Sequence, residues 1–179
     1  FGLTDRDRQP KRAFRVVREL YRSAPYFPLR EQPMVSVVVA CFNGARTLDA
    51  CLDSLKRLNY PAYEVILVDD GSTDATPQIA AKHPNVRCVR HQINQGLSAA
   101  RNTGIDAAQG EIVAFTDSDC RADADWLYYL ISDLLNGSYA GIGGHNLLPP
   151  EDSWVAAAVM VSPGGPTHVM LTDRLAEHI

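Results

Sequence analysis

Short apolar runs alternate with amphipathic segments along the chain from Met34 onward. The runs are rich in Val and Ile, which is typical of strands buried on both faces. In the segments between them, apolar residues recur at every third or fourth position, the spacing of one helix face. Strands are expected at residues 35–40, 64–68, 86–89 and 112–115, with a further one at 139–142. This alternation predicts an α/β fold, with a mostly parallel sheet flanked by helices on both faces.

Turn and capping residues indicate where the helices end. Helices are expected at residues 45–58, 77–82, 97–108 and 124–135. Gly110 follows the third helix, and we interpret it as the C-terminal cap because glycine readily adopts the left-handed conformation that ends many helices. Asp123 precedes the fourth helix, where its carboxylate is expected to accept a hydrogen bond from a free backbone N–H.

The N-terminal arm, residues 1–33, differs from the rest of the chain in charge. It holds eight Lys and Arg against four Asp and Glu, a net charge of +4, whereas residues 34–179 carry −8. Apolar residues recur at helical spacing among the basic ones at 11–22, which predicts a basic amphipathic helix. Such a helix either packs on a protein domain or lies on an anionic membrane surface. Prolines near the end of the arm predict a linker before the main domain.

Composition places the chain among ordinary globular domains. The 179 residues are 46% hydrophobic and 21% charged, which excludes a disordered chain, and one domain is expected at this length. No apolar stretch reaches the roughly 18 residues that a membrane-spanning helix needs. No basic stripe with interleaved aromatics follows Pro33, so nucleic-acid binding is not expected. The pattern breaks off at Ile179, and we expect a piece of a longer protein.

The four cysteines, at positions 41, 51, 88 and 120, lack the spacing of a zinc or redox motif. We expect all four to be buried free thiols. Free thiols favour a reducing compartment, so a cytoplasmic protein is expected, at the inner face of the membrane if residues 11–22 bind lipid.

Residues that can carry chemistry follow three of the expected strands. The segments are Cys41-Phe42-Asn43-Gly44, Asp69-Asp70-Gly71-Ser72 and Asp117-Ser118-Asp119. Parallel sheets bind ligands beyond the carboxyl ends of their strands. Phe42 can stack on a nucleobase, and Asp70 can accept an N–H from it. One carboxylate of the third segment can hold a hard divalent cation, because carboxylates that repel one another need a positive partner. We predict that the carboxylates of Asp70 and Asp119 line one cleft.

Four motifs, in this order and spacing, resemble the family 2 glycosyltransferases with a GT-A fold over about residues 34–145. The motifs are VSVVVACFNG at 35–44, VILVDDGSTD at 65–74, NQGLSAARNTG at 94–104 and FTDSD at 115–119. The resemblance implies the Rossmann-like, N-terminal portion that binds a nucleotide-sugar donor, usually a UDP-sugar, with Mg²⁺ or Mn²⁺ as cofactor. It further implies transfer of the sugar, with inversion, to a hydroxyl group of a carbohydrate, lipid or protein acceptor.

The resemblance also assigns roles to matching residues. Asp70 would pair with the base, Asp117 would lie near the ribose, and Asp119 would bind the metal that bridges to the diphosphate. The implied donor-binding residues are Ala40, Cys41, Phe42, Asn43, Asp70, Gly96, Arg101, Asp117 and Ser118, and the implied metal ligand is Asp119. Phe42 stands where the family often has tyrosine, a change that keeps base stacking and removes a hydroxyl contact.

The catalytic base is expected beyond Ile179. Inversion needs a carboxylate that takes the proton of the acceptor hydroxyl, and in the family this group lies well after the second acidic motif. Glu151-Asp152 follows that motif too closely and is interpreted as a surface turn. Residues 146–179 are therefore expected to begin an acceptor-side region, and this chain alone is expected to lack the base.

Two other functions remain open. A non-catalytic nucleotide-sugar-binding or interaction module would keep the fold without turnover. A phosphoryl-receiver domain also carries an acidic pair like Asp69-Asp70, but here a strand and a helix precede the pair and no Lys follows Lys82.

Overall fold

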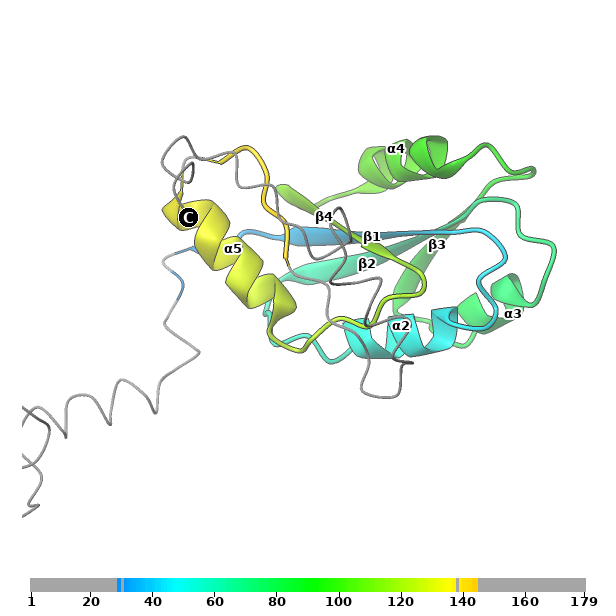
Figure 1. The fold of residues 1–179 in the computed structure, drawn as a ribbon, viewed down its shortest axis with the longest axis horizontal. Helices are drawn as coiled ribbons and strands as arrows, with labels where there is room; N and C mark the ends of the chain where they lie inside the picture. Colours follow the sequence, from blue (N-terminus) through cyan, green and yellow to red (C-terminus); the bar gives the residue numbers. More distant parts are fainter. Residues whose placement is uncertain (1–28, 30, 138, 145–179) are drawn as a thin grey trace, which may run out of the picture.

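The computed structural model describes residue 29 and residues 31–137 and 139–144. Strands and helices alternate along this part of the chain (Figure 1). The elements are β1 (Val35–Cys41), α2 (Leu48–Leu55), β2 (Tyr63–Asp69), α3 (Thr76–Ala80), β3 (Val86–Arg90), α4 (Leu97–Ala107), β4 (Ile112–Asp117) and α5 (Trp126–Asn136). The amphipathic helix expected at 11–22 and the acceptor-side region expected at 146–179, with Glu151-Asp152, lie outside the described residues. The domain limits at 33 and 145 stay predictions.

The four strands form one parallel sheet in the order β3-β2-β1-β4. Val38 of β1 pairs with Ile66 of β2 on one side and with Phe115 of β4 on the other. The two central strands are buried along most of their length, which explains their uninterrupted apolar sequence. The expected α/β fold with a parallel sheet is confirmed.

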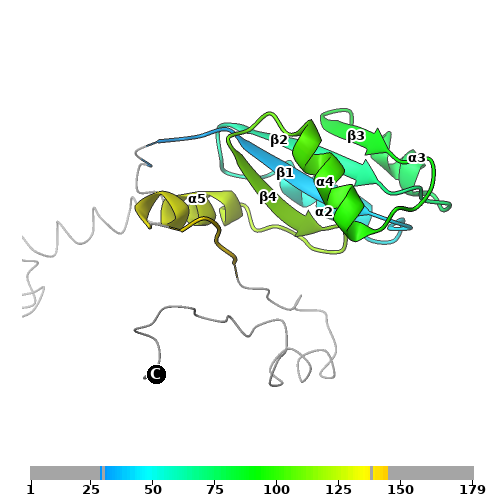
Figure 2. The same ribbon diagram turned by 90° about the horizontal axis from the view of Figure 1, so that it is seen from above.

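Helices cover both faces of this sheet (Figures 1 and 2). Helix α4 covers one face, where Ala100 belongs to the same buried cluster as Val38 and Ile66. The larger core lies on the opposite face and joins β1 to α2 and α5 through residues such as Leu52 and Leu127. Leu52 and Leu127 are fully buried, and burial of each such side chain contributes roughly 1.5–3 kcal/mol.

Helix α4 approaches the sheet closely because Gly104 has no side chain. A Cβ atom at this position would lie 2.3 Å from Cγ1 of Val38. Val38 is β-branched and buried, so its side chain cannot rotate out of the way. This contact explains a glycine in the middle of a helix, where it costs about 0.5–1 kcal/mol relative to alanine.

The predicted cap at Gly110 is wrong, and at Asp123 the expected hydrogen bond forms but the helix begins later than expected. Helix α4 ends before Gly110, which packs against the β1 backbone, and a Cβ there would lie 2.6 Å from the carbonyl oxygen of Met34. The Gly110 N–H donates to Oγ of Ser36 at 2.9 Å. Asp125 directly precedes α5, and the carboxylate of Asp123 accepts a hydrogen bond from the N–H of Asp125 at 2.9 Å. Asp123 thus closes the turn before the helix.

Two further predictions are also wrong. Residues 139–144 contain no strand, so the one expected at 139–142 is absent from this described segment, whose several glycines have low strand propensity. Cys88 is exposed and Cys120 is partly exposed, whereas Cys41 and Cys51 are buried as expected. Cys88 lies on the edge strand β3, where alternate side chains face away from the core.

Candidate functional site

The carboxyl ends of β1, β2 and β4 meet at one edge of the sheet (Figure 2). Strand β1 lies between the other two, with Cys41 paired to Asp69 and Ala40 paired to Asp117. The three segments singled out in the sequence therefore leave neighbouring strands at the same edge, as expected for a parallel sheet. The cleft between Asp70 and Asp119 stays a prediction.

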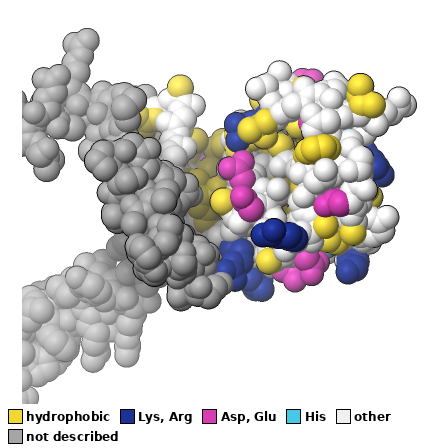
Figure 3. Space-filling model, turned by 45° about the vertical axis from the view of Figure 1, so that its right-hand side comes forward, with side chains coloured by type: hydrophobic (Ala, Val, Ile, Leu, Met, Phe, Trp, Pro, Cys, Tyr) yellow, Lys and Arg dark blue, Asp and Glu magenta, His cyan; other side chains and the backbone are white. Residues whose placement is uncertain are grey.

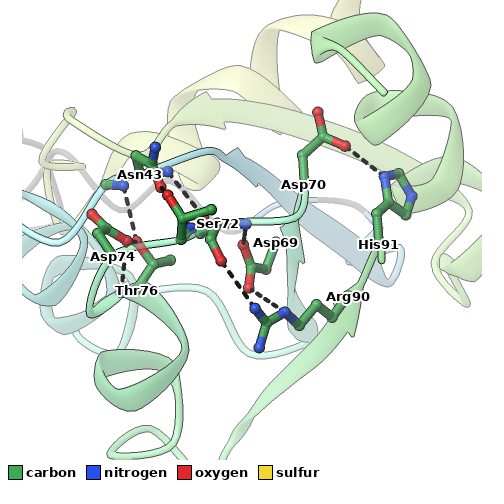
Figure 4. Close-up of polar contacts among 10 residues, drawn as sticks. Asn43, Asp69, Asp70, Ser72, Asp74, Thr76, Arg90 and His91 are labelled. Carbon is green, nitrogen blue, oxygen red and sulfur yellow. Dashed lines mark hydrogen bonds and ion pairs between the residues drawn. The ribbon is translucent and has the colours of Figure 1, made fainter. Parts of the chain in front are cut away.

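Hydrogen bonds join the loop after β1 to the loop after β2 (Figure 4). The N–H of Asn43 donates to Oγ of Ser72, and Oδ1 of Asn43 accepts from the N–H of Thr73, both at 2.9 Å. Asn43 has a positive φ of 52°, a conformation that asparagine tolerates better than most residues. The N–H of Gly44 donates to Oγ1 of Thr76 at 2.9 Å. These contacts fix the loop that carries Phe42.

Asp74 completes the junction between the two loops. Its Oδ2 accepts from the N–H of Ala45 at 3.1 Å, and its Oδ1 accepts from the N–H and the hydroxyl of Thr76 at 2.9 and 2.5 Å. The hydroxyl bond from Thr76 is the main reason that the pKa of Asp74 lies below its ordinary value. Helix α2 begins at Leu48, after this loop, and ends at Leu55, so it is shorter than the helix expected at 45–58.

Replacing Asp74 by asparagine is expected to destabilise the fold at pH 7 and to flatten the acid side of its stability profile. A carboxylate whose pKa is lowered by folding contributes stability above its unfolded pKa, near 3.8, and loses it as the pH falls through the folded value. The difference in unfolding free energy between the wild type and Asp74→Asn should therefore be complete at pH 7 and shrink below about pH 4.

Urea denaturation across this pH range measures that difference. Asp106→Asn is the matched control, because Asp106 is an exposed carboxylate on α4. A difference that stays constant down to about pH 2 would contradict the prediction.

Asp69, the first residue of the acidic pair, makes its contacts within the protein. Its side chain is fully buried, and its Oδ1 accepts from the N–H of Ser72 at 2.9 Å. Its Oδ2 lies 3.2 Å from Nε of Arg90 in an ion pair, and Arg90 also donates to the carbonyl oxygen of Ser72 at 2.9 Å (Figure 4). Asp69 therefore ties the turn after β2 to the edge strand β3.

Asp70 is held by three donors. Its Oδ1 accepts from the N–H of Gln95 at 2.9 Å and lies 2.7 Å from Nδ1 of His91, while its Oδ2 accepts from the N–H of Gly96 at 2.8 Å. Burial by itself would raise the pKa of Asp70, but these donors outweigh burial, and the pKa lies below its ordinary value. The carboxylate is therefore ionised at neutral pH. Gly96 has a φ of 92°, which explains the glycine at this position.

The sequence alone does not indicate His91, whose imidazole bridges Asp70 and helix α4. Its Nε2 lies 2.9 Å from Oγ1 of Thr103. In a sequence, histidines that bind a metal are recognised by their characteristic spacing from other metal ligands, and His91 has no such neighbours. The one signal in the sequence is its position directly after β3, beside the acidic loop.

Arg101 of α4 and Asp117 of β4 meet at the same edge. Nη2 of Arg101 lies 3.2 Å from Oδ1 of Asp117, and both side chains remain exposed enough to reach a ligand. The face of the molecule in Figure 3 mixes Lys and Arg with Asp and Glu. Attraction of an anionic ligand to the carboxyl edge therefore depends on individual side chains such as Arg101 rather than on a broad basic patch.

Asp117, Asp119 and Cys120 form the one cluster of potential metal ligands within the described ranges, with ligand atoms within 4.8 Å of one another. Mg²⁺ is often held by one or two protein carboxylates together with substrate phosphates, so the two aspartates fit such an ion. Burial, with the nearby carboxylates, raises the pKa of the Cys120 thiol. With two carboxylates and one thiol, the cluster offers mainly oxygen ligands, and carboxylate oxygens suit hard cations.

Cys41, Gly44 and Ser118 pack together beneath this edge. A Cβ atom on Gly44 would lie 2.4 Å from Sγ of Cys41 and 3.4 Å from Oγ of Ser118. Cys41 is buried, and burial raises the pKa of its thiol. Phe42, by contrast, is 49% exposed, so its ring is open to a partner.

The comparisons with known proteins agree with this arrangement. A parallel sheet with helices on both faces defines the doubly wound class of α/β folds, in which ligands bind beyond the carboxyl ends of the strands. The family model named glycosyl transferase family 2 matches residues 36–159. The chain therefore belongs to glycosyl transferase family 2, and the resemblance stated from its motifs is confirmed. This membership overturns the phosphoryl-receiver alternative.

Similar proteins include a relative and two solved structures. EpsH of Bacillus subtilis, named as a putative glycosyltransferase, is 48% identical over 100 residues, or 54% of this chain and 28% of EpsH. S. aureus TarS in complex with UDP-GlcNAc has a TM-score of 0.53 and 32% identity, covering 55% of this chain and 30% of that one. The mannosyltransferase PcManGT from Pyrobaculum calidifontis, in complex with GDP-Man and Mn²⁺, has a TM-score of 0.54 and 32% identity over 66% of this chain and 37% of that one. The chain thus spans less than two fifths of each protein.

Proposed function

We propose that this chain is the donor-binding part of a glycosyltransferase that moves a sugar from a nucleotide diphosphate to an acceptor hydroxyl with inversion. The observation that carries the proposal is the position of Asp70, Arg101, Asp117 and Asp119 on loops and elements that meet at one sheet edge. Family membership and the nucleotide-sugar complexes of TarS and PcManGT support it.

The base of the donor is proposed to be uracil, paired with Asp70 and stacked on Phe42. Each oxygen of a carboxylate offers about two acceptor positions. Oδ1 of Asp70 already has two donors and Oδ2 has one, which leaves one position on Oδ2. The pairing edge of uracil carries one N–H, whereas that of guanine carries an N–H and an adjacent amino group. One remaining acceptor position therefore favours a UDP-sugar over a GDP-sugar.

The diphosphate is proposed to lie between Asp119 and Arg101. Asp119 would hold the cation, and Asp117 would lie toward the ribose. A bound Mg²⁺ or Mn²⁺ would offset the negative charge that develops on the leaving diphosphate. Arg101 adds a placed positive charge at the same edge. The other residues proposed to line the donor site are Ala40, Cys41, Asn43, Gly96 and Ser118.

The general base and the acceptor site are proposed to belong to another part of the protein, with the base beyond Ile179. The acceptor is a carbohydrate, lipid or protein hydroxyl. In the part of the chain that the structure describes, no helix combines the length and the apolar character needed to cross a bilayer. A cytoplasmic location, and contact of residues 11–22 with a membrane surface, stay predictions.

Calorimetry on the full-length protein tests donor binding. UDP is expected to bind more tightly than GDP when Mn²⁺ is present, and more weakly after the metal is removed. Asp70→Asn is expected to weaken UDP binding by about tenfold, since a hydrogen bond to a charged group contributes roughly 1.5–3 kcal/mol. Asp106→Asn should leave it unchanged.

Failure of the folded protein to bind any nucleotide with Mn²⁺ present would overturn the proposal. Equal affinity for UDP and GDP would overturn the assignment of uracil alone. UDP-sugar binding without hydrolysis or transfer by the full-length protein would favour the non-catalytic module.

A further inference from the structure

His91 connects the carboxylate proposed to recognise the base with the middle of helix α4. The backbone N–H of His91 donates to the carbonyl oxygen of Asp69 at 2.9 Å. This bond continues the pairing of β3 with β2 and places the imidazole beside Asp70. The His91 and Asp70 side chains are only 9% and 4% exposed, and Nδ1 lies 2.7 Å from Oδ1 (Figure 4). On its other side, Nε2 lies 2.9 Å from Oγ1 of Thr103.

Both ring nitrogens of His91 have a partner, and the chemistry of Asp70 sets the role of Nδ1. The ionised carboxylate of Asp70 can only accept, so Nδ1 of His91 carries a proton and donates to it. The hydroxyl of Thr103 can both donate and accept, so it can hold Nε2 in either protonation state of the ring. The ring is held at both ends, by groups from two different elements.

The other two donors to Asp70 cannot replace His91. The amides of Gln95 and Gly96 both belong to the segment that leads into α4. Among the described residues, His91 is the one side chain that donates to Asp70. Together with Gln95 it fills Oδ1, so the remaining acceptor position lies on Oδ2. Without His91, an acceptor position would open on Oδ1, and the carboxylate would be held only by the amides of Gln95 and Gly96, which both come from one segment.

We propose that His91 is a positioning residue for donor recognition, which holds Asp70 so that one defined oxygen faces the base, while Thr103 holds His91. The inference rests on the proposed function, because it takes Asp70 as the group that contacts the base. Thr103 lies two positions after Arg101 on α4, so the same helix orients both the base contact and the charge proposed for the diphosphate.

A pair of probes isolates this contact. UDP and N3-methyl-UDP differ at the single N–H that is proposed to donate a hydrogen bond to Asp70. With Mn²⁺ present, the full-length wild-type protein is expected to bind UDP at least about tenfold more tightly than N3-methyl-UDP. Pyrophosphate with Mn²⁺ reports on the diphosphate site alone.

Variants of His91 and Thr103 should change the UDP to N3-methyl-UDP ratio in a defined order. His91→Ala is expected to bring the ratio close to one and to leave pyrophosphate affinity within about twofold. His91→Asn keeps an N–H donor near the Nδ1 position, and Thr103→Val removes only the bond that holds the ring, so both are expected to keep an intermediate ratio. Thr103→Ser retains the hydroxyl and should match the wild type. Thr103→Val carries the test if His91→Ala does not fold.

The outcomes separate this inference from the function on which it rests. A wild-type protein that binds UDP and N3-methyl-UDP equally would overturn base pairing by Asp70, and the role of His91 with it. A ratio that Asp70→Asn reduces but His91→Ala and Thr103→Val leave intact would overturn the inference alone. Parallel loss of UDP, N3-methyl-UDP and pyrophosphate affinity in a folded His91→Ala protein would also overturn it, because a residue that positions only the base contact leaves the diphosphate site intact.

Discussion

Replacing Asp119 by asparagine is expected to remove the Mn²⁺ dependence of UDP binding and to lower kcat/KM of the full-length protein by roughly 100- to 1000-fold. Asp119 and Asp117 are exposed carboxylates whose oxygens lie within 4.8 Å of each other. Asp117 already has Arg101 as a partner at 3.2 Å, so Asp119 is the carboxylate with more freedom to hold a cation. An amide of the same size keeps the shape and removes the charge, so the loss should come from the cation.

Calorimetric titration of UDP with and without Mn²⁺ measures the first effect, and steady-state sugar transfer measures the second. Asp106→Asn is the matched control, since it removes one exposed carboxylate of α4 away from the edge. If Asp119→Asn retained the metal dependence of the wild type, the assignment of Asp119 would be wrong. A large fall in kcat/KM for Asp106→Asn would instead indicate an effect of net charge.

The strands could be predicted because burial on both faces requires a continuous apolar sequence. Strands β1 and β2 are buried on both faces, and a strand in that position must be apolar at nearly every residue. Helix caps were harder to predict. Gly110 has the sequence signature of a helix cap but serves a close contact with the β1 backbone, and residue type alone does not distinguish these two uses of glycine.

The acidic residues of the site could be located from sequence, because the carboxyl ends of parallel strands share one edge. Their individual roles could not. Asp69 and Asp70 are adjacent, yet the buried Asp69 pairs with the half-exposed Arg90, while Asp70 accepts hydrogen bonds from the segment before α4. Asn43 and Ser72 are 29 positions apart. Such partnerships depend on three-dimensional contacts that no local pattern encodes.

Replacing Gly71 by alanine is expected to destabilise the fold by about 3 kcal/mol. Two costs add at this position. Gly71 has a φ of 73°, a left-handed conformation that costs an L-residue roughly 1–2 kcal/mol. A Cβ would also lie 2.6 Å from the carbonyl carbon of Ile93 and 2.7 Å from the nitrogen of Asn94, and backbone atoms cannot rotate away as a side chain can. The segment that must move leads directly to the amides of Gln95 and Gly96 that hold Asp70.

Two other glycines separate these costs. Gly96 has a φ of 92° and a ψ of 160°, a region that is nearly restricted to glycine, but a Cβ added there would have no neighbour within 4 Å. Gly96→Ala should therefore show a dihedral cost alone, about 1–3 kcal/mol. Gly141 has neither a positive φ nor a close neighbour, so Gly141→Ala should change stability by less than about 0.5 kcal/mol. Urea denaturation of the three variants measures the series. A loss of only about 1 kcal/mol in Gly71→Ala, the dihedral cost alone, would show that the backbone contact at Gly71 relaxes at no cost, and would remove the reason to expect a shift in the segment that holds Asp70.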